Sequence, residues 1–123
     1  MKTLGRDLDF CISQATSFSM SAINIFHETD LYAEWFSNLR DIKGRARIAA
    51  RIESAKAGNF GAYKVLDEGV CEMKIDFGPG YRVYYAQEGL HVYLLIVGGD
   101  KSTQKKDIAK ARELWRMIRE ERQ

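Results

Sequence analysis

Residues 77–85 read Phe-Gly-Pro-Gly-Tyr-Arg-Val-Tyr-Tyr, and this stretch joins a turn to the start of a strand. Pro79 presets the backbone for the second position of a tight turn, and Gly80 can adopt the positive φ that a type II turn needs next. The residues from Tyr81 onward are aromatic or β-branched, which favours a strand. The stretch therefore predicts a hairpin, with Arg82 held close to its turn.

Strand-like runs on both sides of this turn extend the hairpin into a sheet. They cover residues 63–66, 70–77, 81–86 and 90–97, and short connections that contain glycine separate them. Such a series predicts an antiparallel meander. The run from 92 to 97 is apolar almost throughout, so we expect this strand to be central and covered on both faces. Residues 22–29 form a further short apolar run and predict a first strand.

Two helices are expected between the first strand and the meander. Thr29 or Asp30 can cap the first. In this helix Leu31, Trp35 and Leu39 recur at helical spacing, with Tyr32 and Phe36 alongside. Lys43-Gly44 is the expected break between the two helices. The second helix should run from residue 45 to 56, with its arginines pointing outward and Ile48, Ile52 and Ala55 pointing inward.

A last helix should follow the sheet, after Gly98-Gly99-Asp100 ends the strand. Ser102 or Thr103 is a suitable cap for it. Its expected buried stripe consists of Ile108, Ala111, Trp115 and Ile118. The prediction is an α+β fold, in which an N-terminal helical pair and a C-terminal helix pack on an antiparallel β-sheet. Residues 1–20 read as a flexible N-terminal extension, and residues 21–123 as the folded domain.

The chain has 123 residues, 46% of them hydrophobic, which suits one domain with one modest core. Its net charge is only +2, but basic side chains concentrate in two segments. Residues 40–51 carry five basic residues against one acid, and residues 101–123 carry eight against four. Such segments could attract nucleic acid or an acidic protein, and solvated helix faces explain them equally well.

The residue types that bind metals do not form a recognisable motif. Cys11 and Cys71 lack a CxxC spacing, and His27 and His91 lack an HxH or HxxxH spacing. We therefore expect no metal and no cofactor. The absence of a long apolar run and of a secretory signal favours a reduced, cytoplasmic protein that does not bind membranes.

The expected register separates the two basic side chains nearest the turn. Pairing around a two-residue loop at 79–80 would put Phe77 opposite Arg82 and Lys74 opposite Tyr85. Lys74 and Arg82 would then lie on opposite faces of the sheet, unless a bulge changed the register. The N-terminus of the last helix offers a separate anion site, beside Lys101, Ser102 and Thr103.

Five blocks of sequence between Ile23 and Trp115 resemble the RelE/HigB superfamily of bacterial toxins, specifically its phage-related addiction module killer protein branch. The blocks are Arg-Ala-Arg-Ile-Ala-Ala-Arg-Ile (45–52), Gly-Asn-Phe-Gly (58–61), Gly-Val-Cys-Glu-Met-Lys-Ile (69–75), the stretch at 77–85, and Gly-Gly-Asp-Lys-Ser-Thr-Gln-Lys-Lys-Asp-Ile (98–108). The resemblance implies the RelE-like form of the α+β fold described above.

The same resemblance implies the toxin of a type II toxin–antitoxin pair. Relatives enter the ribosome and cut mRNA without a metal, and their partner is a helix-turn-helix antitoxin of the HigA kind. Arg82 matches the phosphate-contacting position, Lys74 matches a basic position of the preceding strand, and Lys101 falls in the basic segment after the sheet. These three are the candidate catalytic residues. The candidate RNA-binding residues are Arg45, Lys64, Tyr81, Ser102, Thr103, Lys105 and Lys106.

Metal-free RNA cleavage needs a base for the 2′-hydroxyl proton, cations for the charge at phosphorus, and an acid for the leaving oxygen. Arg82 suits the second role, because a guanidinium pairs well with phosphate. The catalytic histidines of some HigB toxins and the C-terminal tyrosine of RelE have no match in this sequence. Two other functions therefore stay open: a non-enzymatic inhibitor of DNA gyrase, as in ParE toxins, and a non-toxic protein-binding module.

Overall fold

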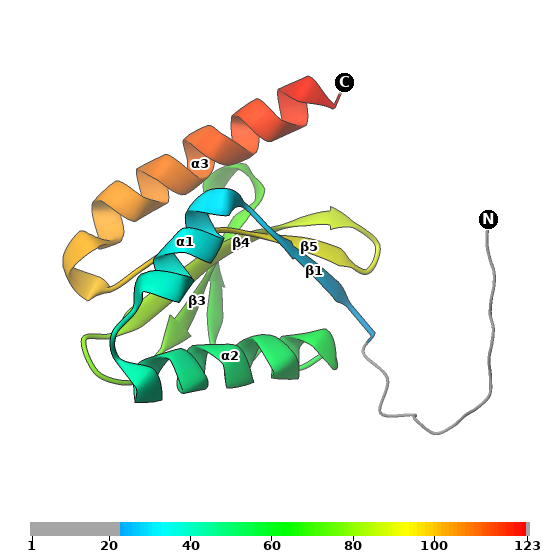
Figure 1. Cartoon of the computed structure of the whole chain (residues 1–123). Helices are drawn as coiled ribbons and strands as arrows, with labels where there is room; N and C mark the ends of the chain where they lie inside the picture. Colours follow the sequence, from blue (N-terminus) through cyan, green and yellow to red (C-terminus); the bar gives the residue numbers. More distant parts are fainter. Residues whose placement is uncertain (1–22, 123) are drawn as a thin grey trace, which may run out of the picture.

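The computed structural model describes residues 23–122, in which three α-helices pack on a five-stranded mixed sheet. Figure 1 shows the sheet between α3 (Gln104–Glu121) on one side and α1 (Asp30–Asn38) and α2 (Ile42–Lys56) on the other. The strands are β1 (Ile25–Glu28), β2 (Tyr63–Val65), β3 (Val70–Ile75), β4 (Tyr81–Gly89) and β5 (Val92–Gly99). The predicted α+β class is confirmed. The expected extension at residues 1–20 lies outside the described residues.

The strand order is β1-β5-β4-β3-β2, and the four strands after α2 form the expected antiparallel meander. The sheet is nevertheless not wholly antiparallel, because β1 pairs with β5 in parallel. Parallel neighbours need a long connection, and here the connection comprises both helices and the rest of the sheet. β4, rather than β5, is the central strand.

Thr29 caps α1 and ties it to the sheet, as its position predicted. Its Oγ1 accepts a hydrogen bond from the Tyr32 backbone N–H at 3.0 Å and donates one to the Ile96 carbonyl at 2.7 Å. The apolar face predicted for α1 is buried in part. Tyr32 is 3% exposed, and Trp35, Phe36 and Leu39 pack against the same cluster, whereas Leu31 is 41% exposed.

The expected break at Gly44 is wrong, since α2 begins earlier and Gly44 lies in its first turn. Asp41 caps the helix by accepting the Gly44 N–H at 3.0 Å, and it also accepts the Tyr81 hydroxyl at 2.7 Å. A Cβ at Gly44 would lie 2.6 Å from the Asp41 carboxylate and 2.7 Å from the Tyr81 ring. Glycine at this position therefore allows α2 to approach β4 closely.

The hydrogen bonds to Asp41 make the stability of the fold depend on pH. They lower the pKa of this carboxyl, with the Gly44 N–H as the larger cause and the Tyr81 hydroxyl next. The folded state thus binds the proton more weakly than the unfolded chain, whose pKa is about 3.9. The stabilisation is present above that pH and is lost as the pH falls through the lowered folded pKa. Urea midpoints from pH 5 to pH 2 should fall less for Asp41→Asn than for the wild type; equal slopes would contradict this assignment.

Two apolar clusters cover the two faces of the sheet. The cluster toward α1 and α2 contains Tyr32, Ile48, Ile52, Ala55, Met73, Ile75, Tyr81, Val83, Tyr85 and Leu95. The cluster toward α3 contains Val70, Tyr84, Ala86, Leu94, Ile96, Val97, Ala111 and Trp115. The predicted stripe of α3 is confirmed, since Ala111 and Trp115 are buried and Ile108 and Ile118 pack beside them.

Gly98 and Gly99 belong to β5, whereas the sequence suggested that they end the strand. Both admit a side chain from a neighbouring helix. A Cβ at Gly98 would lie 2.1 Å from the Trp35 ring, and one at Gly99 would lie 1.8 Å from the Asp107 carboxylate. The absence of side chains here allows α1 and α3 to pack against opposite faces of the same strand end.

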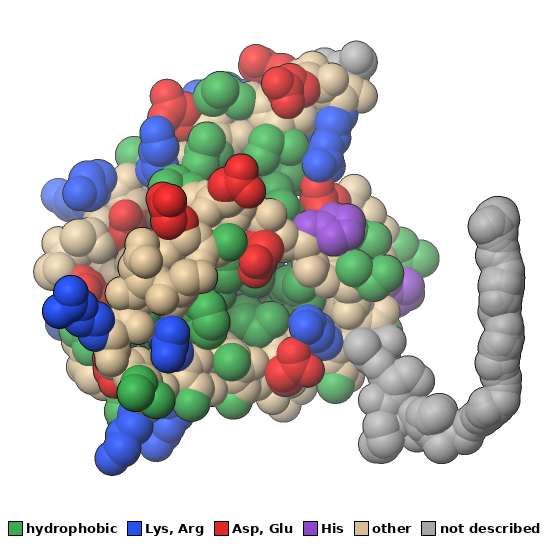
Figure 2. All heavy atoms as spheres, in the orientation of Figure 1, with side chains coloured by type: hydrophobic (Ala, Val, Ile, Leu, Met, Phe, Trp, Pro, Cys, Tyr) green, Lys and Arg blue, Asp and Glu red, His purple; other side chains and the backbone are tan. Residues whose placement is uncertain are grey.

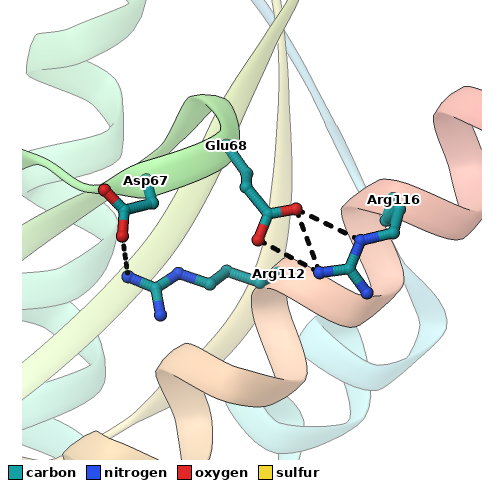
Figure 3. Close-up of polar contacts among 4 residues, drawn as sticks. All are labelled: Asp67, Glu68, Arg112 and Arg116. Atoms are coloured by element: carbon teal, nitrogen blue, oxygen red, sulfur yellow. Dashed lines mark hydrogen bonds and ion pairs between the residues drawn. The ribbon is translucent and has the colours of Figure 1, made fainter.

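The second half of α3 is attached to the turn before β3 (Figure 3). Glu68, which has a positive φ of 62°, accepts hydrogen bonds from Arg116 at 3.0 and 3.1 Å. Asp67 accepts one from Arg112 at 3.3 Å. Each pair is partly solvated, and such pairs contribute about 0–1 kcal/mol, so they orient the helix more than they stabilise it.

Candidate anion-binding cleft

The hairpin register differs from the prediction, and this difference determines which side chains meet at the candidate site. Lys74 lies directly opposite Arg82, and Ile75 lies opposite Tyr81. The loop therefore spans residues 76–80. The Gly80 N–H donates to the Phe77 carbonyl at 3.1 Å, so the closed turn begins one residue earlier than expected and lengthens the loop. The positive φ expected at Gly80 is confirmed, at 80°.

This register brings Lys74 and Arg82 to the same face of the sheet. Directly opposed residues of an antiparallel pair share a face, and so do alternate residues of one strand. Lys64 opposes Glu72 across β2 and β3, and Glu72 opposes Tyr84 across β3 and β4. A cleft of about 230 Å³ opens on this face, lined by Ala62, Tyr63, Lys64, Glu72, Lys74, Arg82 and Gln104.

Arg82 is buried at this cleft. It is 7% exposed, and its Nη1 donates to the Gly80 carbonyl at 2.6 Å. Its Nε is buried and has no hydrogen-bond partner. Within residues 23–122, the ion pairs of the structure do not include one to Arg82. A buried cation with an unused donor is costly, and a bound anion would relieve that cost.

Glu72 and its two partners form the other wall of the cleft. Glu72 is 5% exposed, and its Oε2 accepts hydrogen bonds from the Tyr84 hydroxyl at 3.0 Å and from Gln104 Nε2 at 2.8 Å. Burial, followed by the charge of Glu72, raises the pKa of Tyr84. Glu72 and Gln104 were not predicted as site residues from the sequence. Period-two spacing from Lys74 could have indicated Glu72, but the contact with Gln104 depends on how α3 docks.

Arg51 positions the rim of the cleft from the opposite side of the sheet. We expected it to point outward, but its guanidinium donates to the carbonyls of Phe60 at 3.0 Å, Ala62 at 2.9 Å and Lys74 at 2.5 Å. These bonds attach the loop before β2 to the end of β3. Both Ala62 and Lys74 line the cleft, so Arg51 fixes the backbone on which part of the cleft is built.

Two of the predicted RNA-binding residues lie away from the cleft. Tyr81 faces α2, is 5% exposed and donates its hydroxyl to Asp41, so it does not line the cleft. Burial, and then the hydrogen bond to Asp41, raises the pKa of Tyr81 to about 12, which leaves it protonated at neutral pH. Arg45 lies on α2, the helix on the other face of the sheet from α3.

The polar side chains of the segment after β5 form hydrogen bonds with one another and with the first turn of α3. Asp100 accepts the backbone N–H and the hydroxyl of Ser102, and the Thr103 hydroxyl donates to Asp107 at 2.5 Å. Asp100 is the N-cap of a 3₁₀ turn at Lys101–Thr103, whereas Thr103 occupies the N-cap position of α3 without a capping hydrogen bond from its side chain. Lys101 does not line the cleft, but its Cβ lies 3.5 Å from the position that a Cβ on Gly80 would take, and the Gly80 carbonyl accepts from Arg82.

Lys105 and Lys106 are exposed in the first turn of α3. Lys106 lines a second, mostly apolar groove of about 420 Å³ between α1 and α3, together with Trp35, Gly98 and Lys110. This groove does not include Lys74 or Arg82. The structure thus brings Lys64, Lys74 and Arg82 together, leaves Lys101 nearby, and separates the other predicted residues.

Figure 2 shows lysine and arginine side chains projecting at the left and lower margins of the molecule, beside the start of α3 and the start of α2. Among residues 23–122, no group of three or more His, Cys, Asp and Glu side chains is arranged to hold a metal ion. No described helix combines the length and apolar character that crossing a membrane requires.

Comparison with known proteins relates the chain to a bacterial protein. No family model matches the chain. A protein of Haemophilus influenzae, described as an uncharacterized protein, is 43% identical over 83 residues, which cover 68% of this chain and 84% of the relative. Identity at this level over most of both sequences indicates common descent and a shared fold. The chain therefore belongs to the same family as this Haemophilus influenzae protein.

Proposed function

We propose that this protein is the toxin of a type II toxin–antitoxin system, of the RelE/HigB kind, and that it cuts mRNA on the ribosome without a metal ion. The observation that carries the proposal is the buried Arg82, whose Nε has no partner, directly opposite Lys74 in an open cleft. Lys64 adds a third cation to the same cleft. Such a site suits an anion better than a neutral ligand.

The chemistry follows from the charges in the cleft. Attack on a phosphodiester places additional negative charge on the non-bridging oxygens, and donors held in advance of the reaction stabilise that charge. Arg82 is held by its own hydrogen bond and by burial, so it need not reorganise. At about 230 Å³, the cleft is below the roughly 300 Å³ of common small-molecule pockets. This volume suits one phosphodiester group, with the rest of the RNA lying outside.

The partners proposed with this function are the ribosome with its mRNA and a cognate helix-turn-helix antitoxin, in the cytoplasm. Basic side chains outside the cleft, among them Arg45, Lys105 and Lys106, would contact the phosphates of a large RNA. The cleft alone is too small to explain binding to a ribosome, so this wider basic surface is part of the proposal.

Expression of the chain without its antitoxin should stop growth and produce new 5′ ends inside translated mRNAs. The reason is that cleavage needs both the cleft and the ribosome that presents the mRNA to it. Sequencing of RNA ends after induction measures this directly. An untranslated copy of one target mRNA, made by removing its start codon, is the matched control and should remain intact.

Two outcomes would contradict this function and indicate the alternatives. Growth arrest with intact mRNA, and inhibition of purified DNA gyrase in a supercoiling assay, would indicate a ParE-like inhibitor. Normal growth at a verified level of folded protein would indicate a non-toxic binding module.

A further inference from the structure

We propose that Glu72 is the general base of this site, an inference that rests on the proposed function. The sequence offers no histidine in this role, and an amine in water, with a pKa of about 10.4, is a poor proton acceptor at neutral pH. Glu72 is the only carboxylate among the residues that line the cleft. It lies opposite Tyr84 in the sheet, two residue pairs along from Lys74 and Arg82 and on the same face.

The two oxygens of Glu72 have different surroundings. Both hydrogen bonds that hold the side chain, from Tyr84 and from Gln104, end on Oε2. Oε1 has no hydrogen-bond partner within the described chain, and it is not among the buried unpaired atoms. One oxygen is therefore anchored while the other remains accessible from the cleft. A base needs this arrangement, because its reacting oxygen must be free while its orientation is fixed.

A purely structural carboxylate would be expected to look different. A carboxylate that served to neutralise Arg82 would make an ion pair with it, and among residues 23–122 the ion pairs do not include this one. The guanidinium instead bonds the Gly80 carbonyl. Glu72 and Arg82 thus share the cleft without being paired, so an acceptor and a cation line the same cavity.

The reaction that this arrangement supports is transphosphorylation. Glu72 Oε1 accepts the 2′-hydroxyl proton as the 2′ oxygen forms a bond to phosphorus. The bond from phosphorus to the 5′ oxygen breaks, and that oxygen leaves with the electron pair and takes a proton from the Lys74 ammonium. Lys74 is exposed, so water can restore its proton. The products are a 2′,3′-cyclic phosphate and a 5′-hydroxyl, and no other reactant is consumed.

The pH dependence of wild-type cleavage distinguishes a carboxylate base from a lysine base. A carboxylate is ionised throughout neutral pH, so the single-turnover rate on programmed ribosomes should be nearly constant from about pH 6 to pH 8. A lysine base would require deprotonation, and the rate would rise about tenfold per pH unit. The groups that face the carboxylate in this cleft are Tyr63 and Lys64 from β2, Lys74 from β3, Arg82 and Tyr84 from β4, and Gln104 from α3.

The variant Glu72→Gln keeps the shape of the side chain and an oxygen that can accept from Tyr84 and Gln104. We expect it to fold, to bind ribosomes and to cleave about 100-fold more slowly, which is a common loss for a general base. Its remaining rate should now rise about tenfold per pH unit, because hydroxide has to remove the proton. Glu113→Gln, an exposed substitution on α3, is the matched control and should cleave like the wild type.

The possible results distinguish a failure of the proposed function from a failure of the role assigned to Glu72. Wild-type protein that cuts no mRNA on ribosomes would overturn the proposed function. Cleavage that rises tenfold per pH unit in the wild type would overturn only the role of Glu72, and this measurement needs no folded variant. A Glu72→Gln rate within threefold of the wild type, or a lower rate with an unchanged pH profile, would also reduce Glu72 to a structural residue.

Discussion

Arg82→Ala should lower mRNA cleavage by about 100-fold to 1,000-fold, the loss seen when one preorganised donor for transition-state charge is removed. The physical reason is that Arg82 is the most buried cation of the cleft and its Nε has no partner in the free protein. The measurement is the single-turnover rate on ribosomes programmed with a defined mRNA. In cells, the same variant should permit growth.

The controls separate charge, geometry and folding. Arg82→Lys keeps the charge but loses the planar fork, so its rate should fall between those of the wild type and the alanine variant. Arg116→Ala removes an arginine that pairs with Glu68 outside the cleft, and it should leave cleavage unchanged. Loss of the buried side chain and its bond to Gly80 should lower the free energy of unfolding by about 1–2 kcal/mol, which leaves the domain folded. Full activity of the alanine variant would remove Arg82 from the site.

Trp115→Ala should lower the free energy of unfolding by about 3–5 kcal/mol. Trp115 is 6% exposed in the cluster between α3 and the sheet, and the Arg119 guanidinium lies 5.7 Å from the centre of its ring. Its Nε1 would lie 3.2 Å from a Cβ on Gly69, so the ring also covers the turn before β3. For a domain of this size the melting temperature should fall by roughly 12 °C or more.

The matched control for this loss is on the same helix. Met117 is 55% exposed, and Met117→Ala should change the free energy of unfolding by no more than about 0.5 kcal/mol. Urea unfolding of the two variants under one set of conditions measures the difference. If both variants were destabilised to the same extent, helix propensity rather than burial would account for the effect, and the assignment of Trp115 to the core would be wrong.

Local sequence patterns predicted burial and capping correctly where the feature depends on residues of a single helix. The inward residues Ile48, Ile52 and Ala55 of α2 are buried as their spacing predicted, and so is Trp115 in α3. Thr29 caps α1 because an N-cap needs only a side-chain oxygen next to the first turn. These features depend on neighbours within a few residues along the chain, so the sequence contains the information directly.

Contacts between distant segments were not predictable in this way. Gly44 looked like a helix break, but it is required because Asp41 and the Tyr81 ring occupy the space of its Cβ. Gly98 and Gly99 looked like the end of a strand, but they make room for Trp35 and Asp107. A glycine that ends a helix or strand cannot be told apart by its sequence from a glycine that makes room for another side chain. Only the residues packed around it in the structure distinguish the two.

In the candidate site, too, some features follow from the local sequence and others from contacts between distant segments. The sequence alone determined the α+β class, the hairpin at residues 77–85 and the position of Arg82 next to its turn. Only the tertiary structure decided that Lys74 faces Arg82, because a loop longer than expected changes which residues are paired, and a shift of one residue moves a side chain to the other face. It also placed Glu72 in the cleft, where Gln104 reaches it from a helix 32 residues further along the chain. Spacing along one strand carries no information about that contact, since it arises from the docking of α3 on the sheet.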